Sequence, residues 1–420
     1  MDPAGDEFPS TIRVVIIGGG PGGTACALAL NRLSAEMGRT VHITLVEGKQ
    51  FKGERHYNQC VGVLTPPLPD LLENQLKVPF PHHLCLMEID GYVLHSDDQE
   101  IFLGGANELS FALRRVQFDE YMLDAVIQCG IPMIPARAVD LEFHNDGVTV
   151  YTDSSSLEAD VVVGAFGLDE GSASMFARNT PYQPPNALSS IVTKYVSCPG
   201  SEVDFGTHIH AFLPSHPMIE FGAITPKCSH LTINIAGKAV DANLMNTFLN
   251  HPEVRAVLLN FEHAGAMDCE QPALFKGRFP SSLAHHYYGD RYVMVGDAAG
   301  LVRAFKGKGA TTAVLTGIRA AETIMQYGYS ERAFNDHFLQ ANHEIIEDLP
   351  YGRIMRLAAI YLSRLGLLDA VIRAARGSPE IRSALYDAVS AHALYKDIMK
   401  SSLDPKSMWA VIKAMIKPSP

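Results

Sequence analysis

The stretch TIRVVIIGGGPGGTACALALNRLSAEM, residues 11–37, decides the fold. Its β-branched run from Thr11 to Ile17 predicts a buried strand, and its Ala- and Leu-rich run from Gly22 to about Met37 predicts a helix after a glycine turn. A further apolar run from Val41 to Glu47 predicts the next strand. Strand, glycine turn, helix and strand in this order form a βαβ unit, so the sequence predicts an α/β fold with a Rossmann-like domain.

The glycines of this unit have the spacing of a dinucleotide-binding turn. Gly18 permits the tight turn, Gly20 lets the backbone approach a pyrophosphate, and Gly23 allows close packing of the helix. Glu47 ends the next strand 24 residues after Gly23, where its carboxylate can accept hydrogen bonds from ribose hydroxyls and would repel a 2′-phosphate. The cofactor-binding residues predicted in this unit are Gly18, Gly20, Pro21, Gly22, Gly23, Glu47 and Gly48.

A second glycine-rich stretch, YVMVGDAAGLVRAFKGKGATTAVLTG, covers residues 292–317. A short apolar strand leads into Gly296-Asp297, and a long helix is predicted from Ala310 to Met325. The Asp297 carboxylate can accept from a ribityl hydroxyl, and the first N–H groups of the helix can face the pyrimidine edge of a flavin. The residues predicted to contact the cofactor here are Gly296, Asp297, Gly307, Gly309 and Ala310.

A third stretch, RRVQFDEYMLDAVIQCG at 114–130, belongs to a helix predicted over 108–129. Arg114 or Arg115 precedes Phe118-Asp119, and an arginine at this point can reach a cofactor phosphate or a ribityl oxygen. Arg114 is the residue assigned to the cofactor.

At these three stretches the sequence resembles the flavoprotein superfamily that includes the aromatic hydroxylases and, more closely, the geranylgeranyl reductases. The resemblance covers 14–130 and 292–325. Cys60, in NQCVGVL, stands where those reductases carry a cysteine-glycine segment beside the flavin, and FGAITPKCSHLTINIAG at 221–237 looks like their pocket-lining strand pair. The resemblance implies FAD as cofactor, Cys60 as a catalytic residue, and Cys60, Val61, Arg114 and Ala138 as further cofactor contacts.

Three departures from the family pattern bear on the substrate. Gly222 to Pro226 replace the aromatic segment that commonly lines the pocket, so the substrate does not transfer from the resemblance. Phe166 stands where many hydroxylases have an Asp near the pyrophosphate, and Lys308 stands where many relatives have an acid. A lysine there would add positive charge beside the second helix start.

The resemblance and the strand pattern together divide the chain. Residues 1–182 and 281–330 are assigned to the FAD-binding domain, and an alternating strand pattern assigns 183–280 to an inserted substrate domain with an antiparallel sheet. Residues 331–420 are predicted to be helical, with breaks at Pro350, 377–379 and 404–405.

Composition restricts the partners. The chain has 420 residues and a net charge of −12, whereas residues 353–420 alone carry eleven Lys or Arg and five Asp or Glu. The acidic body disfavours nucleic acid, and the basic, apolar tail is compatible with peripheral contact to an anionic membrane.

The seven cysteines include no Cys-x-x-Cys pair, so we expect no metal or iron–sulfur site. With no signal-like N-terminus, a cytoplasmic location is expected, peripheral to a membrane if the tail binds one.

The sequence favours an FAD-dependent oxidoreductase that reduces carbon–carbon double bonds of a prenyl chain, on a geranylgeranyl lipid or an isoprenoid quinone. A monooxygenase acting on an aromatic or olefinic substrate is the alternative. An electron-transfer flavoprotein that passes electrons to a quinone ranks third, because relatives of that type carry clustered cysteines and none follows Cys269 here. The expected partners are a hydrophobic or lipid substrate and, as reductant, NAD(P)H or a protein donor; Cys60, Tyr57 and His95 are the candidate proton donors.

Overall fold

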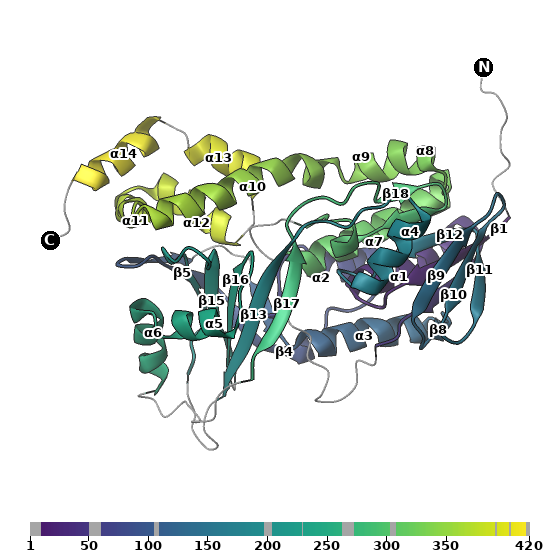
Figure 1. Cartoon of the computed structure of the whole chain (residues 1–420), viewed down its shortest axis with the longest axis horizontal. Helices are drawn as coiled ribbons and strands as arrows, with labels where there is room; N and C mark the ends of the chain where they lie inside the picture. Colours follow the sequence, from purple (N-terminus) through teal and green to yellow (C-terminus); the bar gives the residue numbers. More distant parts are fainter. Residues whose placement is uncertain are drawn as a thin grey trace.

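Two large sheets lie side by side along the long axis of the molecule, and helices from the C-terminal part of the chain run across both (Figure 1). The computed structural model describes nine stretches, and the structural statements below concern these residues. They are 10–49, 60–104, 109–196, 204–228, 230–262, 273–302, 308–390, 393–402 and 405–416.

The first sheet is mainly parallel and has the strand order β18-β19-β12-β1-β2-β8. Neighbouring strands run parallel except at the edge, where β18 pairs antiparallel with β19. Helices cover both faces of such a sheet, which is why β12 consists of the fully buried run VVVG. The α/β, Rossmann-like class predicted from the βαβ unit is confirmed. The strands are β1 (Thr11–Ile17), β2 (Thr40–Val46), β8 (Met133–Ile134), β12 (Val161–Gly164), β18 (Tyr288–Gly289) and β19 (Tyr292–Met294).

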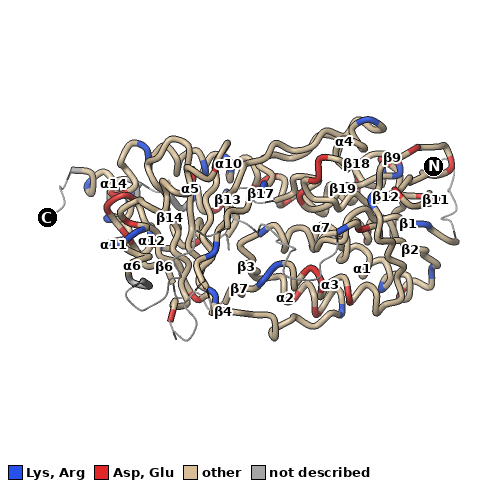
Figure 2. Tube along the Cα trace, turned by 60° about the horizontal axis from the view of Figure 1, so that its bottom comes forward, with Lys and Arg blue, Asp and Glu red and all other residues tan. Residues whose placement is uncertain are grey.

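Two helices cross closely beside this sheet. Figures 1 and 2 show α1 (Pro21–Met37) next to α7 (Gly309–Tyr327). A Cβ atom on Gly317 of α7 would lie 2.3 Å from the carbonyl oxygen of Gly22 in α1, so only glycine permits this crossing. The crossing brings the starts of the two helices, from the two glycine-rich stretches, to the same place.

The second sheet has the order β17-β13-β16-β15-β14-β5-β6 and is antiparallel except between β14 and β5. The sequence assigned 91–104 to the first domain, whereas the structure places β5 and β6 at the edge of this second sheet. Pairing between strands more than 100 residues apart leaves no local pattern, which explains the difference. The strands are β5 (Gly91–His95), β6 (Glu100–Gly104), β13 (Ala187–Val196), β14 (His208–Phe212), β15 (Phe221–Lys227), β16 (His230–Gly237) and β17 (Phe275–Pro280).

Two small sheets and several short helices accompany the two large sheets. The order is β11-β10-β9 in one small sheet and β3-β7-β4 in another. The helix predicted over 108–129 is divided: its apolar start pairs as β7, and α3 begins only at Arg115. The elements are β3 (Val63–Leu64), β4 (Cys85–Ile89), β7 (Ser110–Leu113), α3 (Arg115–Gln128), β9 (Ala138–Phe143), β10 (Val148–Thr152), β11 (Ser156–Ala159), α4 (Glu170–Asn179), α5 (Ala242–Leu249) and α6 (Pro252–Glu262), with short helical turns at α2 (Leu68–Asp70), Leu71–Leu76, His82–Leu84 and Gly296–Ala298.

The C-terminal helices cover the β5–β6 edge of the second sheet. Leu368 and Ile372 share an apolar core with Leu94 and Leu103 of these strands. The predicted break at Pro350 is absent, and α10 continues through this residue. Contacts with α13 hold the helix on both sides of the proline: two backbone N–H groups at the start of α13 donate to Asp348, and the Tyr395 ring packs on Gly352. The helices are α8 (Glu331–Ala333), α9 (Leu339–Ala341), α10 (His343–Arg364), α11 (Leu368–Gly377), α12 (Pro379–Ser390), α13 (Tyr395–Ser402) and α14 (Pro405–Ile416).

None of the helices in the described stretches combines the length and the apolar character needed to cross a bilayer.

Candidate functional site

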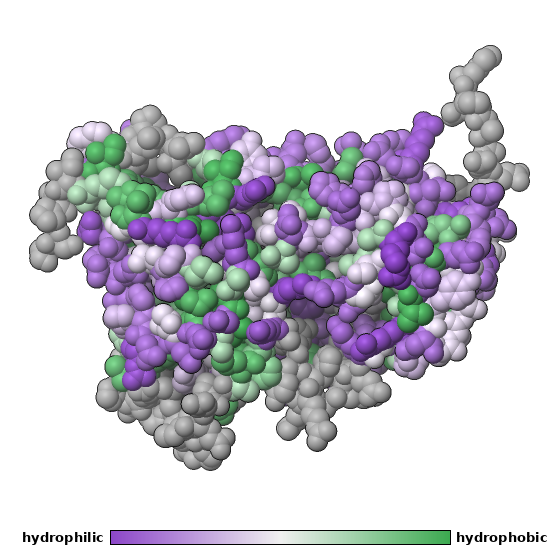
Figure 3. Space-filling model, in the orientation of Figure 1, coloured by the Kyte–Doolittle hydropathy of each residue, from purple (hydrophilic) through white to green (hydrophobic). Residues whose placement is uncertain are grey.

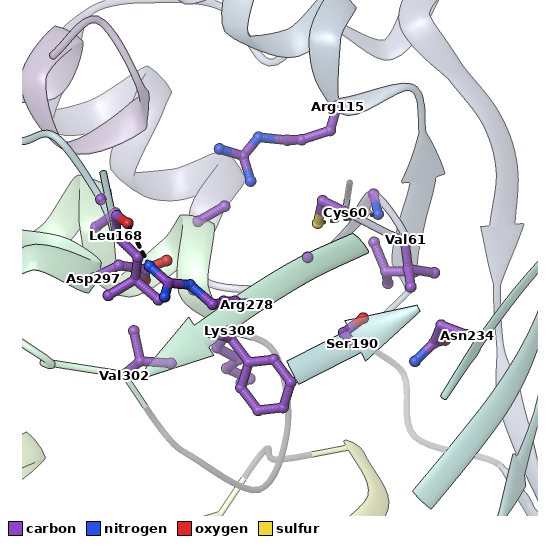
Figure 4. Close-up of a pocket in the computed structure, with 18 of the residues that line it drawn as sticks. Cys60, Val61, Arg115, Leu168, Ser190, Asn234, Arg278, Asp297, Val302 and Lys308 are labelled. Carbon is purple, nitrogen blue, oxygen red and sulfur yellow. Dashed lines mark hydrogen bonds between the residues drawn. The ribbon is translucent and has the colours of Figure 1, made fainter. Parts of the chain in front are cut away.

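A cavity of about 1450 Å³ runs from the glycine turn of α1 to the second sheet. This volume exceeds the several hundred cubic ångströms typical of a site for one small ligand. One end is lined by the turns before α1 and α7, and the other by strands β5, β14, β15, β16 and β17. Figure 4 shows Asp297, Leu168 and Arg278 on one side of the cavity and Cys60, Val61 and Asn234 on the other.

The turn before α1 leaves its helix start open to the cavity. Gly18 has φ +113°, and a Cβ there would lie 2.4 Å from the carbonyl oxygen of Ala165, so glycine is required. Gly20 is the N-cap residue and provides no side-chain acceptor, and a Cβ on it would meet no atom within 4 Å. The first N–H groups of α1 therefore face open space, as an anion-binding helix N-terminus requires.

Glu47, at the end of β2, is held by backbone donors. Its Oε2 accepts from the Gly19 N–H at 2.7 Å, and its Oε1 accepts from the Lys49 N–H at 2.6 Å. A carboxylate has about four acceptor positions, so lone pairs remain for ligand hydroxyl groups. Because Glu47 also lines the cavity, it both fixes the glycine turn and presents an acceptor to a ligand.

The turn before α7 contributes the opposite side of the same end. The Gly296 N–H donates to Thr316 Oγ1 at 2.9 Å, which positions Asp297 on the cavity wall. Burial raises the pKa of the Asp297 carboxyl, and the charge of Arg115 opposes this rise. Gly309 and Ala310 line the cavity at the start of α7.

Lys308 lies at the N-cap of α7 and is only 8% exposed. Its Nζ donates to the carbonyl oxygen of Pro66 at 3.2 Å, and the residue lines the cavity. A cation at a helix N-terminus adds to the positive potential of the helix dipole. The lysine at position 308, where many members of the resembling family have an acid, thus increases the positive potential at this end of the cavity.

Arg115, and not Arg114, reaches the cavity. Arg115 lines it, and its Nε donates to Asp119 Oδ1 at 2.7 Å. Burial lowers the pKa of the Arg115 guanidinium, but Asp119, Cys60 and Asp297 together outweigh burial and the pKa is raised. Arg114 is the N-cap residue of α3 and is not among the residues lining the cavity. Because β7 ends at Leu113, α3 begins only at Arg115, well inside the helix predicted over 108–129; Arg114 is its N-cap residue and Arg115 reaches the cavity.

Replacing Arg115 by Met should lower the free energy of unfolding by about 3 kcal/mol, because Asp119, 3% exposed, would keep a buried charge without this partner. Urea unfolding followed by circular dichroism measures the change. The double variant Arg115→Met/Asp119→Leu should recover at least half of the loss. Equal stability of the single variant and the wild type would show that the pair contributes no net electrostatic stabilisation.

Cys60 and Val61 line the cavity opposite Asp297 (Figure 4). The Gly62 N–H donates to Cys60 Sγ at 3.3 Å, and Gly62 has φ +78° with its Cα against Leu113. Behind this segment Lys227, 3% exposed, donates from Nζ to the carbonyl oxygen of Leu113 at 2.8 Å. Burial, together with the charges of Lys194 and Arg114, lowers the pKa of Lys227 to about 8. Lys227 therefore supports the wall that carries Cys60.

Other predicted residues lie elsewhere. Gly23 packs against the glycine turn, where a Cβ would lie 1.9 Å from the carbonyl oxygen of Gly18, and Gly48 packs on Arg137. Neither they nor Ala138 line the cavity. Gly307 and Tyr57 lie outside the described residues.

His95 is not among the residues that line the cavity; it is buried and pairs with the half-buried His210. Its Nε2 is 3.0 Å from Nδ1 of His210, and its ring stacks on Phe212. Burial lowers the pKa of His95 to about 3 and that of His210 to about 4, although Glu100 lies 3.4 Å from His95 Nδ1. Both rings are neutral at physiological pH, so His95 does not supply a proton as an imidazolium.

This pair should make the protein sensitive to acid. Because the folded-state pKa lies below the unfolded value, the unfolded chain binds more protons below pH 6.5, and stability falls as the pH drops from about 6.5 towards 4. For His95 alone the free energy of unfolding should fall by about 2 kcal/mol between pH 7 and pH 5. Urea unfolding at both values should show a smaller loss in His95→Leu and an unchanged loss in the control His83→Ala, an exposed histidine. An unchanged loss in His95→Leu would contradict this assignment.

The cavity end at the second sheet is mainly apolar. Phe212, Val240 and Val389 contribute apolar side chains, and Ser190 and Asn234 contribute polar ones. The sequence suggested only the strand pair 221–237 here, because Val389 and β5 reach this point through pairing and packing over long distances in the chain. Among the described residues, no group of three or more His, Cys, Asp or Glu side chains could hold a metal ion.

Sequence comparison finds relatives of low identity. No protein-family model matches the chain. A probable electron transfer flavoprotein-quinone oxidoreductase of Escherichia coli is 24% identical over 376 residues, covering 82% of this chain and 83% of the relative. Protein FixC of Salmonella typhi is 22% identical over 333 residues, covering 74% and 76%.

Structural comparison finds neighbours along almost the whole chain. A geranylgeranyl bacteriochlorophyll reductase-like protein of Thermoplasma acidophilum has a TM-score of 0.69 at 18% identity, covering 96% of this chain and 99% of that chain. A flavoprotein/dehydrogenase of Cytophaga hutchinsonii has a TM-score of 0.69 at 18% identity, covering 97% and 100%. A single-residue mutant of the halogenase PltM in complex with FAD has a TM-score of 0.64 at 13% identity, covering 94% and 87%. The chain therefore has the two-domain fold of FAD-binding flavoproteins.

Proposed function

We propose that this protein is an FAD-dependent oxidoreductase that reduces carbon–carbon double bonds of a prenyl chain on a lipid or an isoprenoid quinone. One observation carries the proposal: a single cavity joins a dinucleotide-type glycine turn to a mainly apolar end on the second sheet. A nucleotide cofactor and a long apolar substrate can thus share one enclosure. The reductant is NAD(P)H or a protein electron donor.

The residues at the glycine end fit FAD. The uncapped start of α1 at Gly20 suits a pyrophosphate, and Glu47 retains acceptor capacity for ribose hydroxyls. Asp297 and the start of α7 lie on the facing wall, where they would hold the ribityl chain and the pyrimidine edge. When bound, FAD supplies hydride transfer, which the side chains present do not provide.

The second-sheet end of the cavity and the wall that carries Cys60 suit the reduction of an isolated alkene. Such an alkene is electron-rich, so transfer of a hydride to one carbon must be accompanied by protonation of the other carbon. The reaction also needs a pocket that excludes water. Phe212, Val240 and Val389 line the second-sheet end with apolar residues, and the Cys60 thiol, exposed on the cavity wall, is the ionisable group we assign as proton donor. Lys227, buried behind Gly62, holds this wall in place through Leu113.

The variant Cys60→Ala tests this assignment. It should retain its flavin, because Cys60 offers no charge to the cofactor, and it should turn over a prenyl substrate at least about tenfold more slowly, since a positioned acid contributes roughly 100-fold or more to proton transfer. Product formation by mass spectrometry measures the rate. Cys129→Ala, which removes an exposed cysteine at the end of α3, serves as the matched control. A wild-type rate in Cys60→Ala would limit Cys60 to packing.

Two other functions have specific support. Electron transfer to a quinone is favoured by the relative named a probable electron transfer flavoprotein-quinone oxidoreductase. A monooxygenase is favoured by a structural neighbour named a peptidyl tryptophan dihydroxylase. Incubation with a prenylated quinone under isotopically labelled oxygen separates the three. Our proposal expects a product that gains two hydrogen atoms per double bond and no label. Labelled product would indicate a monooxygenase, and quinol with an unchanged side chain would indicate electron transfer.

A further inference from the structure

Exposed apolar side chains concentrate on two C-terminal helices. Eighteen large apolar side chains are exposed in the described part of the chain, and eight of them belong to α10, to its C-cap residue Leu365 and to α14. We name these eight the C-terminal apolar face. It consists of Tyr351, Ile354, Leu357 and Tyr361 of α10, Leu365 at the C-cap of α10, and Trp409, Ile412 and Met415 of α14.

The spacing of these residues places them on one side of each helix. On α10 they follow at intervals of three or four residues, which is the repeat of a single helical stripe. The opposite side of α10 is buried at Gly352, Arg356 and Ile360. Exposure reaches 60% at Tyr361 and 68% at Leu365, so the rest of the described chain leaves this stripe uncovered.

Helix α14 repeats the arrangement. Ala410, Val411 and Ala414 pack against the core that includes α11, whereas Trp409 is 65% exposed and Ile412 is 49% exposed on the outer side. Figure 3 shows apolar surface at the upper left, over α14 and over the neighbouring part of α10 and α13. Exposed apolar residues of both helices thus lie in the same C-terminal part of the molecule (Figure 1).

The charges on both segments have one sign. Between Asp348 and Asp369 the chain contains three arginines and no acid, and from Pro405 to the end it contains three lysines and no acid. Arg353 and Arg364 of the first segment are exposed, as is Lys413 of the second, which lies over the Trp409 ring at 5.6 Å. The rest of the chain is acidic, since the whole carries a net charge of −12. An anionic partner would therefore attract this face and repel the others.

We propose that the C-terminal apolar face binds the surface of an anionic lipid bilayer, with the apolar side chains inserted below the headgroups and the arginines and lysines against them. Tyr and Trp at the boundary between apolar and charged residues are typical of this position. No described helix spans a bilayer, so the contact is peripheral. Charge decides against a second copy of the chain as occupant, because two such faces would bring like charges together.

The contact would place the cavity close to its substrate. Val389 and Ser390, at the end of α12, line the cavity, and α12 packs with the other C-terminal helices on the second sheet. A lipid chain leaving the bilayer would therefore reach the apolar end of the cavity through this part of the molecule. This substrate route rests on the proposed function. Vesicle binding is measured without turnover, so membrane binding can be absent while the proposed reaction occurs, and membrane binding can be present while the proposed reaction does not occur.

Trp409 provides the test, because it is the only tryptophan in the chain. Vesicles of about 70% phosphatidylcholine and 30% phosphatidylglycerol should shift its fluorescence to shorter wavelength and should sediment with the full-length protein. Pure phosphatidylcholine vesicles should bind at least about tenfold more weakly, and high salt should weaken binding to the anionic vesicles.

The variant Tyr361→Glu/Leu365→Glu should lower binding to the anionic vesicles at least about tenfold, with the circular dichroism spectrum unchanged. Ile127→Glu, at an apolar side chain of α3 that is 47% exposed, should bind like the wild type. Two results would overturn the inference. One is equal binding by the double variant and the wild type; the other is absence of vesicle binding together with a dimer in light scattering that the double variant abolishes, which would assign the face to a second copy.

Discussion

Glu47→Arg should abolish retention of FAD. The substitution removes the acceptor of the Gly19 and Lys49 N–H groups and introduces a cation where the proposed ribose hydroxyls need an acceptor. We expect purified protein to carry flavin at less than about a tenth of the wild-type occupancy, since two charge-assisted hydrogen bonds and the ligand contacts are lost together. Absorbance of the flavin released on denaturation, relative to protein, measures this.

Two variants make the result specific to the site. Glu36→Arg reverses a charge at the far end of α1, where Glu36 forms an exposed ion pair with Arg32, and should keep its flavin. Glu47→Gln retains one side-chain acceptor, so its flavin occupancy should lie between those of Glu47→Arg and Glu36→Arg. Adding FAD to the Glu47→Gln apoprotein should restore part of the occupancy. Full flavin occupancy in Glu47→Arg would show that the glycine turn does not hold the cofactor.

Ala223→Trp should block long substrates while leaving the flavin in place. Ala223 lies in the middle of β15, pairs with Ala211 and Asn234, and lines the cavity at its second-sheet end. An indole there fills space that a prenyl chain needs, so kcat/KM for a long prenyl substrate should fall at least about 100-fold. Steady-state rates with substrates of graded chain length measure the effect.

Chain length separates a blocked cavity from a damaged fold. A substrate with a single prenyl unit should react with Ala223→Trp within about threefold of the wild-type rate, because the cofactor end is untouched. Ala223→Leu, with a smaller side chain, should have a smaller effect, since overpacking costs about 1–3 kcal/mol and rises with added volume. Equal losses for long and short substrates would mean that the apolar end does not hold the substrate chain.

The local part of this architecture could be predicted from the sequence. The β-branched run, the glycines and Glu47 follow one another within 37 residues, so their pattern determines both the βαβ unit and the dinucleotide-type turn. Asp297 was identifiable for the same reason, because the glycines and the helix that position it lie close to it in the chain.

The remaining features depend on contacts distant in sequence. Nothing near 91–104 indicates that β5 pairs with β14, and nothing near Lys227 indicates that its ammonium group is buried against Leu113. The exchange of Arg114 for Arg115 has a different cause: neighbouring residues at a helix start point in directions about 100° apart, so the two arginines do not face the same way. The helix predicted over 108–129 did not place this turn, because α3 begins only at Arg115.

The most direct test of the central claim is an anaerobic half-reaction. The protein is reduced until its flavin absorbance is bleached, oxygen is excluded, and geranylgeranyl lipid or prenylated quinone is added while absorbance and product mass are followed. We predict that the absorbance returns without oxygen, with one equivalent of saturated double bond formed per flavin reoxidised. Absorbance that returns only after oxygen is admitted, with the prenyl chain unchanged, would contradict the assignment of this cavity to double-bond reduction.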